Sequence, residues 1–176
     1  MSEEGPVLVI HNGSDSIQAG FAGDDSAQAV FSSVVGYPRH ASLQGDGDVY
    51  VGDEAQFRRT TLKLQHPISR GIVTNWDHME AIWDYTFREE LRISSEECSV
   101  LLSEPPLNPT ENRVKMVQMM FETFSCAVVD IENSALLSLC ATGRNTGLVI
   151  DCGHEVTHTV PIYEGYALPY ATNCLH

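Results

Sequence analysis

Basic residues are scarce in this chain. Its 176 residues include 10 Lys and Arg against 24 Asp and Glu, which gives a formal net charge of −14 at pH 7. The acidic residues are spread along the chain rather than gathered in one tail. Because a nucleic-acid backbone requires a basic surface, nucleic acid is excluded as the expected partner, and basic partners are favoured.

Long apolar runs and paired cysteines are also missing. No stretch of about 18 apolar residues could span a bilayer, and no N-terminal apolar run has the length of a signal peptide. The sequence therefore predicts an intracellular protein, cytoplasmic or nuclear, that does not insert into membranes. Its reduced thiols are odd in number, widely spaced and without a C-x-x-C pair: Cys98, Cys126, Cys140, Cys152 and Cys174.

The chain is expected to open with a β-hairpin. The apolar run Val7–Ile10 is typical of a buried strand, and the polar segment His11–Asp15 contains a turn glycine, Gly13. Strand character resumes from Ile17 to Phe21. Residues 7–23 are therefore predicted to form two antiparallel strands joined by a short connection.

Helices and strands are predicted to alternate through the middle of the chain. Met116, Met119 and Met120 lie on one face of an expected helix and are interpreted as core residues. In chain order, the expected elements are an exposed mobile loop over 38–48 flanked by short strands, a helix over 54–60 capped by Asp53, a helix beginning after the N-cap Asn75, a strand over 99–104, a helix capped by Asn108 and running to about Phe124, a strand over 126–131 and a helix over 135–141.

The opening pattern recurs near the end of the sequence. Residues 147–153 repeat the order of residues 7–13, an apolar run followed by a polar pair and a glycine, and a second strand-like stretch follows each. A duplicated architecture and a coincidence between two ordinary hairpins account equally well for this pattern. If the architecture is duplicated, the second copy is incomplete, because no further helices are expected before His176.

Several stretches resemble actin, and they occur in actin's order. Together they span nearly the whole chain, at residues 19–25, 50–56, 71–77, 106–109, 120–124 and 156–169. The resemblance implies the α/β fold of actin, Hsp70-type chaperones and sugar kinases, in which two related lobes close on a nucleotide and a divalent cation. It assigns residues 1–31 and 67–143 to the first lobe, 32–66 to a small inserted subdomain with a mobile loop, and 144–176 to the opening hairpin of an incomplete second lobe.

In that fold, the backbone N–H groups of two facing hairpin turns hold the phosphates. On the first turn, Ser14 matches the family's phosphate-contacting serine, and Gly13 permits the tight turn. His11 stands where the family has an aspartate beside the cation's water shell, and Gln18 stands where a lysine contacts phosphate. Asp15 replaces a usual glycine and is expected to bring negative charge near the phosphates.

On the second turn, the resemblance matches Asp151 to a cation-side aspartate and Gly153 to the turn glycine. His154 and Glu155 stand where the family has aspartate and then glycine. A Cβ atom and a carboxylate would therefore occupy the place where phosphate approaches the backbone, which weakens the expected binding.

Two further positions concern hydrolysis. Ser134 aligns with the glutamine that orients the attacking water, and His158 matches a histidine near that water. Taken singly, each of these residues could be an ordinary turn, strand or helix-surface residue without a functional role. The prediction therefore rests on the clustering of the substitutions at one site. The sequence predicts weak or absent binding of ATP and Mg²⁺, no metal site and no ATPase activity.

Assembly into filaments is not expected. In the loop over 41–48, where the family inserts apolar residues into a neighbouring subunit, Leu43 is the only large apolar residue, and two aspartates are added. Arg70 stands where the family has its modified histidine. Three functions remain open: a truncated structural or regulatory cytoskeletal protein that binds actin or actin-binding proteins, a fragment of an ATP-binding filament-forming actin, and a remnant without function.

Overall fold

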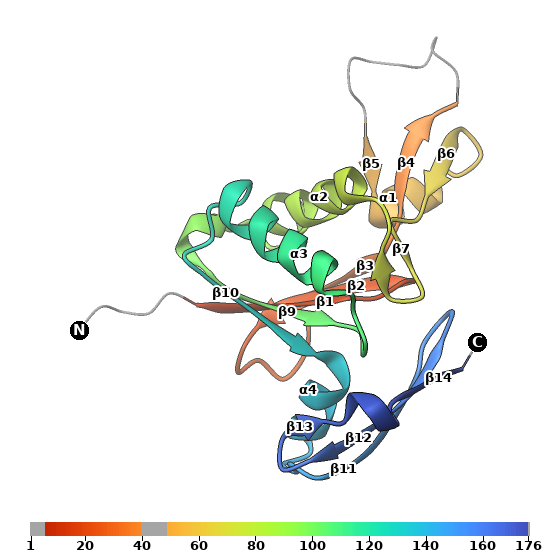
Figure 1. Cartoon of the computed structure of the whole chain (residues 1–176). Helices are drawn as coiled ribbons and strands as arrows, with labels where there is room; N and C mark the ends of the chain where they lie inside the picture. The colour runs from red at the N-terminus through yellow and green to blue at the C-terminus, as the bar shows by residue number, and fades with distance from the viewer. Residues whose placement is uncertain (1–5, 40–48, 176) are drawn as a thin grey trace.

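The computed structural model describes residues 6–39 and 49–175, which form a mixed α/β structure. Figure 1 shows two helices on one side of a central sheet, and a further helix with a second sheet on the other side. The central sheet has the strand order β10-β9-β1-β2-β3. Its strands are β1 (Val7–Asn12), β2 (Ser16–Phe21), β3 (Ala29–Ser32), β9 (Ser99–Glu104) and β10 (Val128–Asn133).

The core lies between the central sheet and its two covering helices. β1 pairs antiparallel with β2 and parallel with β9, which places Ile10 opposite both Ala19 and Leu102. Successive side chains of a strand alternate between faces, so one apolar row of β1 points into this core. The covering helices are α2 (Trp76–Tyr85), extended by the π-helical turn η2 (Thr86–Glu90), and α3 (Thr110–Glu122).

A small sheet stands at one end of the central sheet, beside α2 (Figure 1). Its order is β5-β4-β6, and the short helix α1 packs beside it. The elements are β4 (Val35–Pro38), β5 (Tyr50–Val51), α1 (Gly52–Phe57) and β6 (Leu62–Gln65), followed by the separate hairpin β7 (Ile68–Ser69) and β8 (Ile72–Val73).

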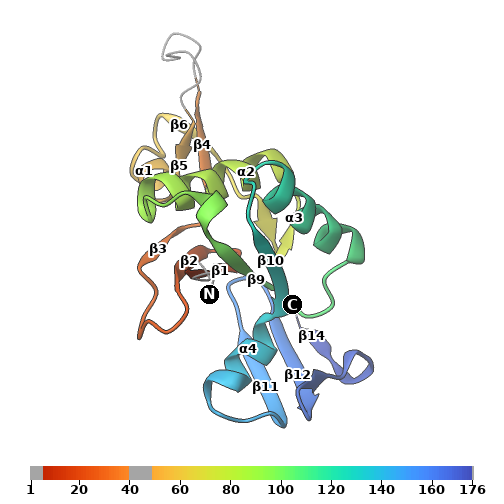
Figure 2. The same cartoon turned by 90° about the vertical axis from the view of Figure 1, so that its left-hand side faces the viewer.

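The last segment forms a second sheet against helix α4. In this sheet β12 pairs with β11, β13 and β14. Figure 2 shows α4 lying along β11, where Leu139 packs with Val160 and Ile162 in a separate apolar cluster. The elements are η3 (Ser95–Glu97), α4 (Ser134–Ala141), β11 (Gly147–Cys152), β12 (Thr157–Tyr163), β13 (Tyr166–Ala167), η4 (Pro169–Ala171) and β14 (Asn173–Leu175).

Most of the predicted elements are confirmed. Both hairpins form in antiparallel register, and Asn75 caps α2 by accepting a hydrogen bond from the His78 N–H at 3.0 Å. Met116, Met119 and Met120 are buried in the core, as expected. Of the predicted loop over 38–48, residues 40–48 lie outside the described residues. The division into lobes stays a prediction.

Two predicted helix caps are wrong. α1 begins at Gly52, and the Asp53 carboxylate instead accepts hydrogen bonds from the N–H and hydroxyl of Ser32 on β3. α3 begins at Thr110, and the Asn108 amide donates to Glu104 at 2.9 Å rather than capping the helix. In both cases, a polar group of a neighbouring strand competes successfully for the side chain.

None of the helices formed by the described residues is both long enough and apolar enough to cross a bilayer.

A buried polar junction joins the first hairpin to the core. The Trp83 indole donates to Asn12 Oδ1 at 3.1 Å, and the Asn12 amide donates to the Ser103 carbonyl at 3.4 Å. The Ser103 hydroxyl accepts from the Asn12 N–H at 3.2 Å. Trp83 is fully buried, so these bonds satisfy polar atoms that water does not reach.

Replacing Trp83 by Phe tests this junction. The variant leaves a buried amide oxygen without its donor and opens space in the core, so the free energy of unfolding should fall by about 2–4 kcal/mol. Urea denaturation followed by circular dichroism measures the loss. The matched control is Trp76→Phe at the half-buried start of the same helix, which should cost less than about 1 kcal/mol. Equal losses in the two variants would contradict a special role for the Asn12 contact.

Candidate functional site

The two hairpin turns predicted to face each other line one cavity of about 480 Å³. The first turn follows β1 in the central sheet, and the second follows β11 in the second sheet, so one element from each sheet contributes to the walls. The cavity therefore joins the two halves of the described structure. Its lining comprises His11–Ser16, Gln18, Gly71, Ser103–Pro106, Ser134, Asp151–Val156 and His158.

The two turns close in the same way. In each, four residues connect a cross-strand pair, Asn12 with Ile17 in the first hairpin and Cys152 with Thr157 in the second. The N–H of Gly13 donates to the carbonyl three residues later at 3.1 Å, and the N–H of Gly153 does the same at 3.0 Å. This shared closure supports the duplicated architecture over a coincidence.

Both turn positions are sterically tight, and the crowding is more severe at Gly13 than at Gly153. A Cβ atom added at Gly13 would lie 2.6 Å from the carbonyl oxygen of Ser16, and one at Gly153 would lie 3.0 Å from that of Val156. Each of these oxygens accepts the hydrogen bond that closes its turn. Any larger residue would therefore push apart the groups that define the turn.

Four predicted site residues form two cross-strand pairs in equivalent places. His11 lies opposite Gln18 in the first hairpin, and Asp151 lies opposite His158 in the second. All four line the cavity, and His158 is buried. The structure therefore brings together residues that the sequence separates by well over a hundred positions.

His11 lies in a largely desolvated environment. Its Nδ1 is 2.8 Å from the Ser103 hydroxyl. Burial lowers the pKa of His11 below its ordinary value, and the nearby Asp151 carboxylate raises it by a smaller amount. The neutral imidazole is therefore favoured at neutral pH, which leaves the carboxylates of the cavity without a compensating charge at this position.

The β7–β8 hairpin contacts both turns. The Ser14 hydroxyl accepts a hydrogen bond from the Gly71 N–H at 2.8 Å. The Glu155 carboxylate accepts one from the neighbouring Arg70 N–H. Figure 1 shows the tip of the β11–β12 hairpin reaching toward the β7–β8 connection. A side chain of its turn thus attaches the second sheet to the β7–β8 hairpin, which is itself bonded to the first turn.

Carboxylates dominate the charge of the cavity. Asp15, Glu104, Asp151 and Glu155 line it together with three histidines, and no Lys or Arg belongs to the described lining. An ion pair between the two turns is long, because His154 Nδ1 lies 3.9 Å from Asp15 Oδ1, and both side chains are largely exposed. The cavity is consequently acidic.

Ser134 lies at the start of α4, in the wall of the cavity. The helix is capped by Asn133, whose side-chain oxygen accepts from the Ala135 N–H at 2.9 Å. This cap fixes the position of Ser134, whose short side chain extends only one hydroxyl from the helix. Within residues 6–39 and 49–175, no three His, Cys, Asp or Glu side chains are arranged to hold a metal ion.

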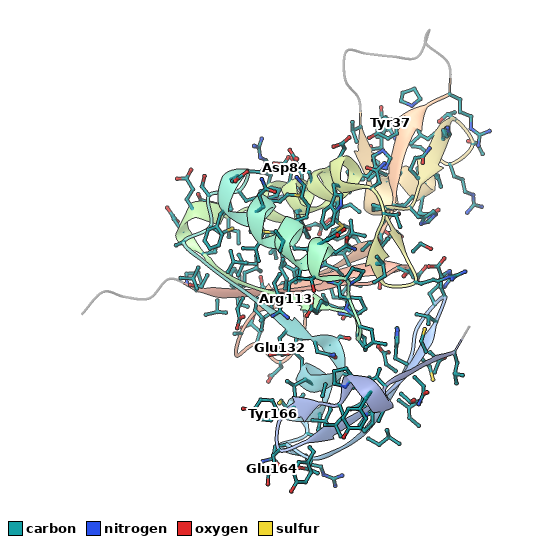
Figure 3. The ribbon with its side chains drawn as sticks, in the orientation of Figure 1. Tyr37, Asp84, Arg113, Glu132, Glu164 and Tyr166 are labelled. Atoms are coloured by element: carbon teal, nitrogen blue, oxygen red, sulfur yellow. The ribbon has the colours of Figure 1, made fainter. Side chains whose placement is uncertain are left out.

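Sequence reasoning missed two parts of the site. Ser103 holds both His11 and Asn12, and Glu104 is paired with Arg113 at 2.9 Å. Arg113, labelled in Figure 3, also donates to the Ile131 carbonyl at 2.6 Å and so spans from α3 to the sheet. The sequence did contain a signal for Ser103 and Glu104. Both residues end strand β9, which is parallel to β1, and ligand sites often lie at the carboxyl ends of parallel strands.

The environment of His11 leads to a prediction about the pKa of its side chain. Its pKa should lie below about 6.5, the ordinary value for histidine, and Asp151→Asn should lower it further because a favourable negative charge is removed. Since the unfolded chain binds this proton more readily, the contribution of His11 to stability should fall as pH drops through the unfolded-state pKa. Histidine NMR titration measures the value. Asp130→Asn, which removes a carboxylate at an exposed position of β10, is the control and should leave the His11 pKa unchanged. A His11 pKa above the ordinary value would contradict the proposed burial.

Comparison with known protein families gives one match. A family model described as Actin matches residues 2–176, all of the chain except its first residue. The mixed sheet, the flanking helices and the two equivalent hairpins agree with the actin-type ATPase fold that the resemblance implied. The chain therefore belongs to the actin family.

Proposed function

We propose that this actin-family protein is a nucleotide-independent binding protein of the cytoskeleton, and that it has no ATPase activity. The partners we infer are actin itself or proteins that recognise the first lobe of actin. The observation that carries the proposal is the acidic cavity between the two turns, whose described lining lacks Lys and Arg. The retained first-lobe structure supplies a surface for the partner.

Electrostatics argue against a polyphosphate in this cavity. Gln18 replaces the lysine that the family resemblance places beside phosphate, so a cation is absent where a polyanion would need one. Asp15 and Glu155 add negative charge on the two turns that face the same space. Like charges within a few ångströms repel, although solvent weakens the repulsion between exposed groups.

The second turn also presents a steric obstacle. Phosphate binding at such a turn needs the backbone N–H groups to be accessible, and glycine serves this purpose best. Here His154 and Glu155 carry side chains at the two positions after Gly153, and the Glu155 carboxylate reaches the Arg70 N–H. The approach available to a phosphate is therefore reduced.

The residues present do not fit Mg²⁺ well either. Mg²⁺ prefers oxygen ligands and retained waters, but the first-turn position carries His11, whose neutral imidazole lies against Ser103. Asp151 remains as one suitable oxygen donor. Ser134 lacks the reach of the glutamine that orients water in the family. Phosphoryl transfer depends on positioning and electrostatics, so these changes together should suppress turnover.

The alternative function is that of an ATP-binding, filament-forming actin represented by its N-terminal part. It is favoured by the preserved closure of both turns and by Ser14, Asp151 and His158, which keep the family's residue types. A remnant without function is the third possibility, and reversible cooperative unfolding of the chain would argue against it. Nucleotide titration separates the first two possibilities.

The chain should give no binding heat with Mg-ATP up to about 1 mM, a limit that corresponds to about −4 kcal/mol. Isothermal titration calorimetry makes the measurement. A variant that restores the family pattern at five positions should gain measurable binding, because it returns a cation and clears the second turn. These changes are His11→Asp, Asp15→Gly, Gln18→Lys, His154→Asp and Glu155→Gly. Micromolar binding by the unaltered chain would overturn the proposal.

Binding to actin or to actin-binding proteins should be insensitive to nucleotide. Co-sedimentation with filaments and pull-down with monomeric actin should give the same bound fraction with and without Mg-ATP. The five-position variant serves as the matched control, because its cavity is altered while the outer surface of α2 and α3 is unchanged. Absence of binding to filaments, to monomers and to first-lobe ligands would rule out the partner assignment.

A further inference from the structure

The connection between β7 and β8 is a two-residue turn with an uncommon backbone. Ser69 pairs with Ile72, so only Arg70 and Gly71 lie between the strands. Their φ angles are 54° and 77°, both in the left-handed region. Two consecutive residues of this kind form the type I′ turn that suits a two-residue hairpin. Gly71 adopts this conformation readily, whereas Arg70 does so at some energetic cost.

Both N–H groups of this turn point out of the hairpin and bind side chains from distant parts of the chain. The Gly71 N–H donates to the Ser14 hydroxyl at 2.8 Å, across 57 positions of sequence. The Arg70 N–H donates to the Glu155 carboxylate, across 85 positions. Each N–H therefore has its own acceptor, a hydroxyl for Gly71 and a carboxylate for Arg70. A backbone N–H that is not used within its own hairpin can bind an anionic group, and at Arg70 that group is a carboxylate.

We propose that the Arg70–Gly71 turn is an anion-binding site whose ligand is the carboxylate of Glu155 in the same chain. Through this hydrogen bond, the tip of the β11–β12 hairpin is attached to the β7–β8 hairpin. The second sheet is thereby joined to the β7–β8 hairpin, which in turn bonds to Ser14 on the first turn. Inorganic phosphate would bind the Arg70 N–H once the Glu155 carboxylate is removed.

The surroundings favour the Arg70 N–H as the partner of Glu155. Among the described residues that line the cavity, no Lys or Arg offers the carboxylate an alternative. A hydrogen bond from a backbone N–H to a charged carboxylate is stronger than one between neutral groups. The neighbouring contact between His154 and Asp15 is long and solvent-exposed, so it contributes little to the attachment.

Amide exchange at Arg70 tests the assignment directly. In the full ¹⁵N-labelled chain, Glu155→Ala should speed solvent exchange of the Arg70 amide by about tenfold or more, because it loses a bond to a charged acceptor. Glu155→Gln keeps a neutral acceptor of similar shape and should give an intermediate rate. The Gly71 amide, held by Ser14, should change much less in both variants.

The matched control is Glu164→Ala. Glu164 is an acidic residue on the β12–β13 turn of the same sheet, and Figure 3 shows it at the lower end of the molecule. The variant removes the same charge and should leave the Arg70 amide unchanged. Unaltered Arg70 exchange in Glu155→Ala, or an equal increase in Glu164→Ala, would overturn the proposal. Exchange of the core amides of β1 reports global unfolding. If the Glu155→Ala variant does not fold, the Arg70 exchange rate in Glu155→Gln alone tests the proposal.

A second measurement tests the anion preference. Inorganic phosphate at about 10 mM, a concentration suited to millimolar affinity, should slow Arg70 exchange in Glu155→Ala and have no effect in the unaltered chain. Lack of protection in the variant would show that the turn does not bind anions. These exchange measurements involve neither ATP nor a cytoskeletal partner. A negative result for the Glu155 contact would therefore leave the proposed function untouched, and a negative result for the proposed function would leave the Glu155 contact untouched.

Discussion

The buried amide of Asn12 is the constraint on which the rest of the site depends. It is bonded to Trp83 on α2 and to Ser103 on β9, and it immediately precedes the first turn. A buried polar group without partners is costly, so these bonds hold the end of β1 in one position relative to the helix and the neighbouring strand. The location of Gly13 and Ser14 follows from that position.

Shape and chemistry are separable in this cavity. The two turns have the same length, the same closing hydrogen bond and a glycine at the same place, so their backbone geometry is equivalent. The side chains around them have a different character, since carboxylates and histidines line the space. Backbone closure depends on glycine and hydrogen bonding, whereas ligand preference depends on charge, so the two properties can vary independently.

The acidic character of the cavity is reinforced by its partial burial. Burial lowers the pKa of His11 by more than the nearby Asp151 raises it, so the His11 side chain does not supply a steady positive charge at neutral pH. Glu104 is balanced by Arg113, but that arginine bonds from outside the cavity lining. The charge that remains exposed to the cavity agrees in sign with the net charge of the whole chain, −14.

The sequence by itself determined both hairpins and the two long helices, because alternating apolar residues, helical spacing and glycine position act locally. It also indicated the actin relationship, through the resemblance of several stretches along the chain. It also identified His11, Gln18, Asp151 and His158 as members of one site, but only through resemblance. The tertiary structure alone decided that Asp53 and Asn108 do not cap their helices, because strand partners compete for these side chains. Likewise, it alone revealed Ser103 beneath His11 and Glu155 on the Arg70 N–H. These contacts join residues 85 or more positions apart, and no local pattern encodes which distant groups a folded backbone brings within hydrogen-bonding distance.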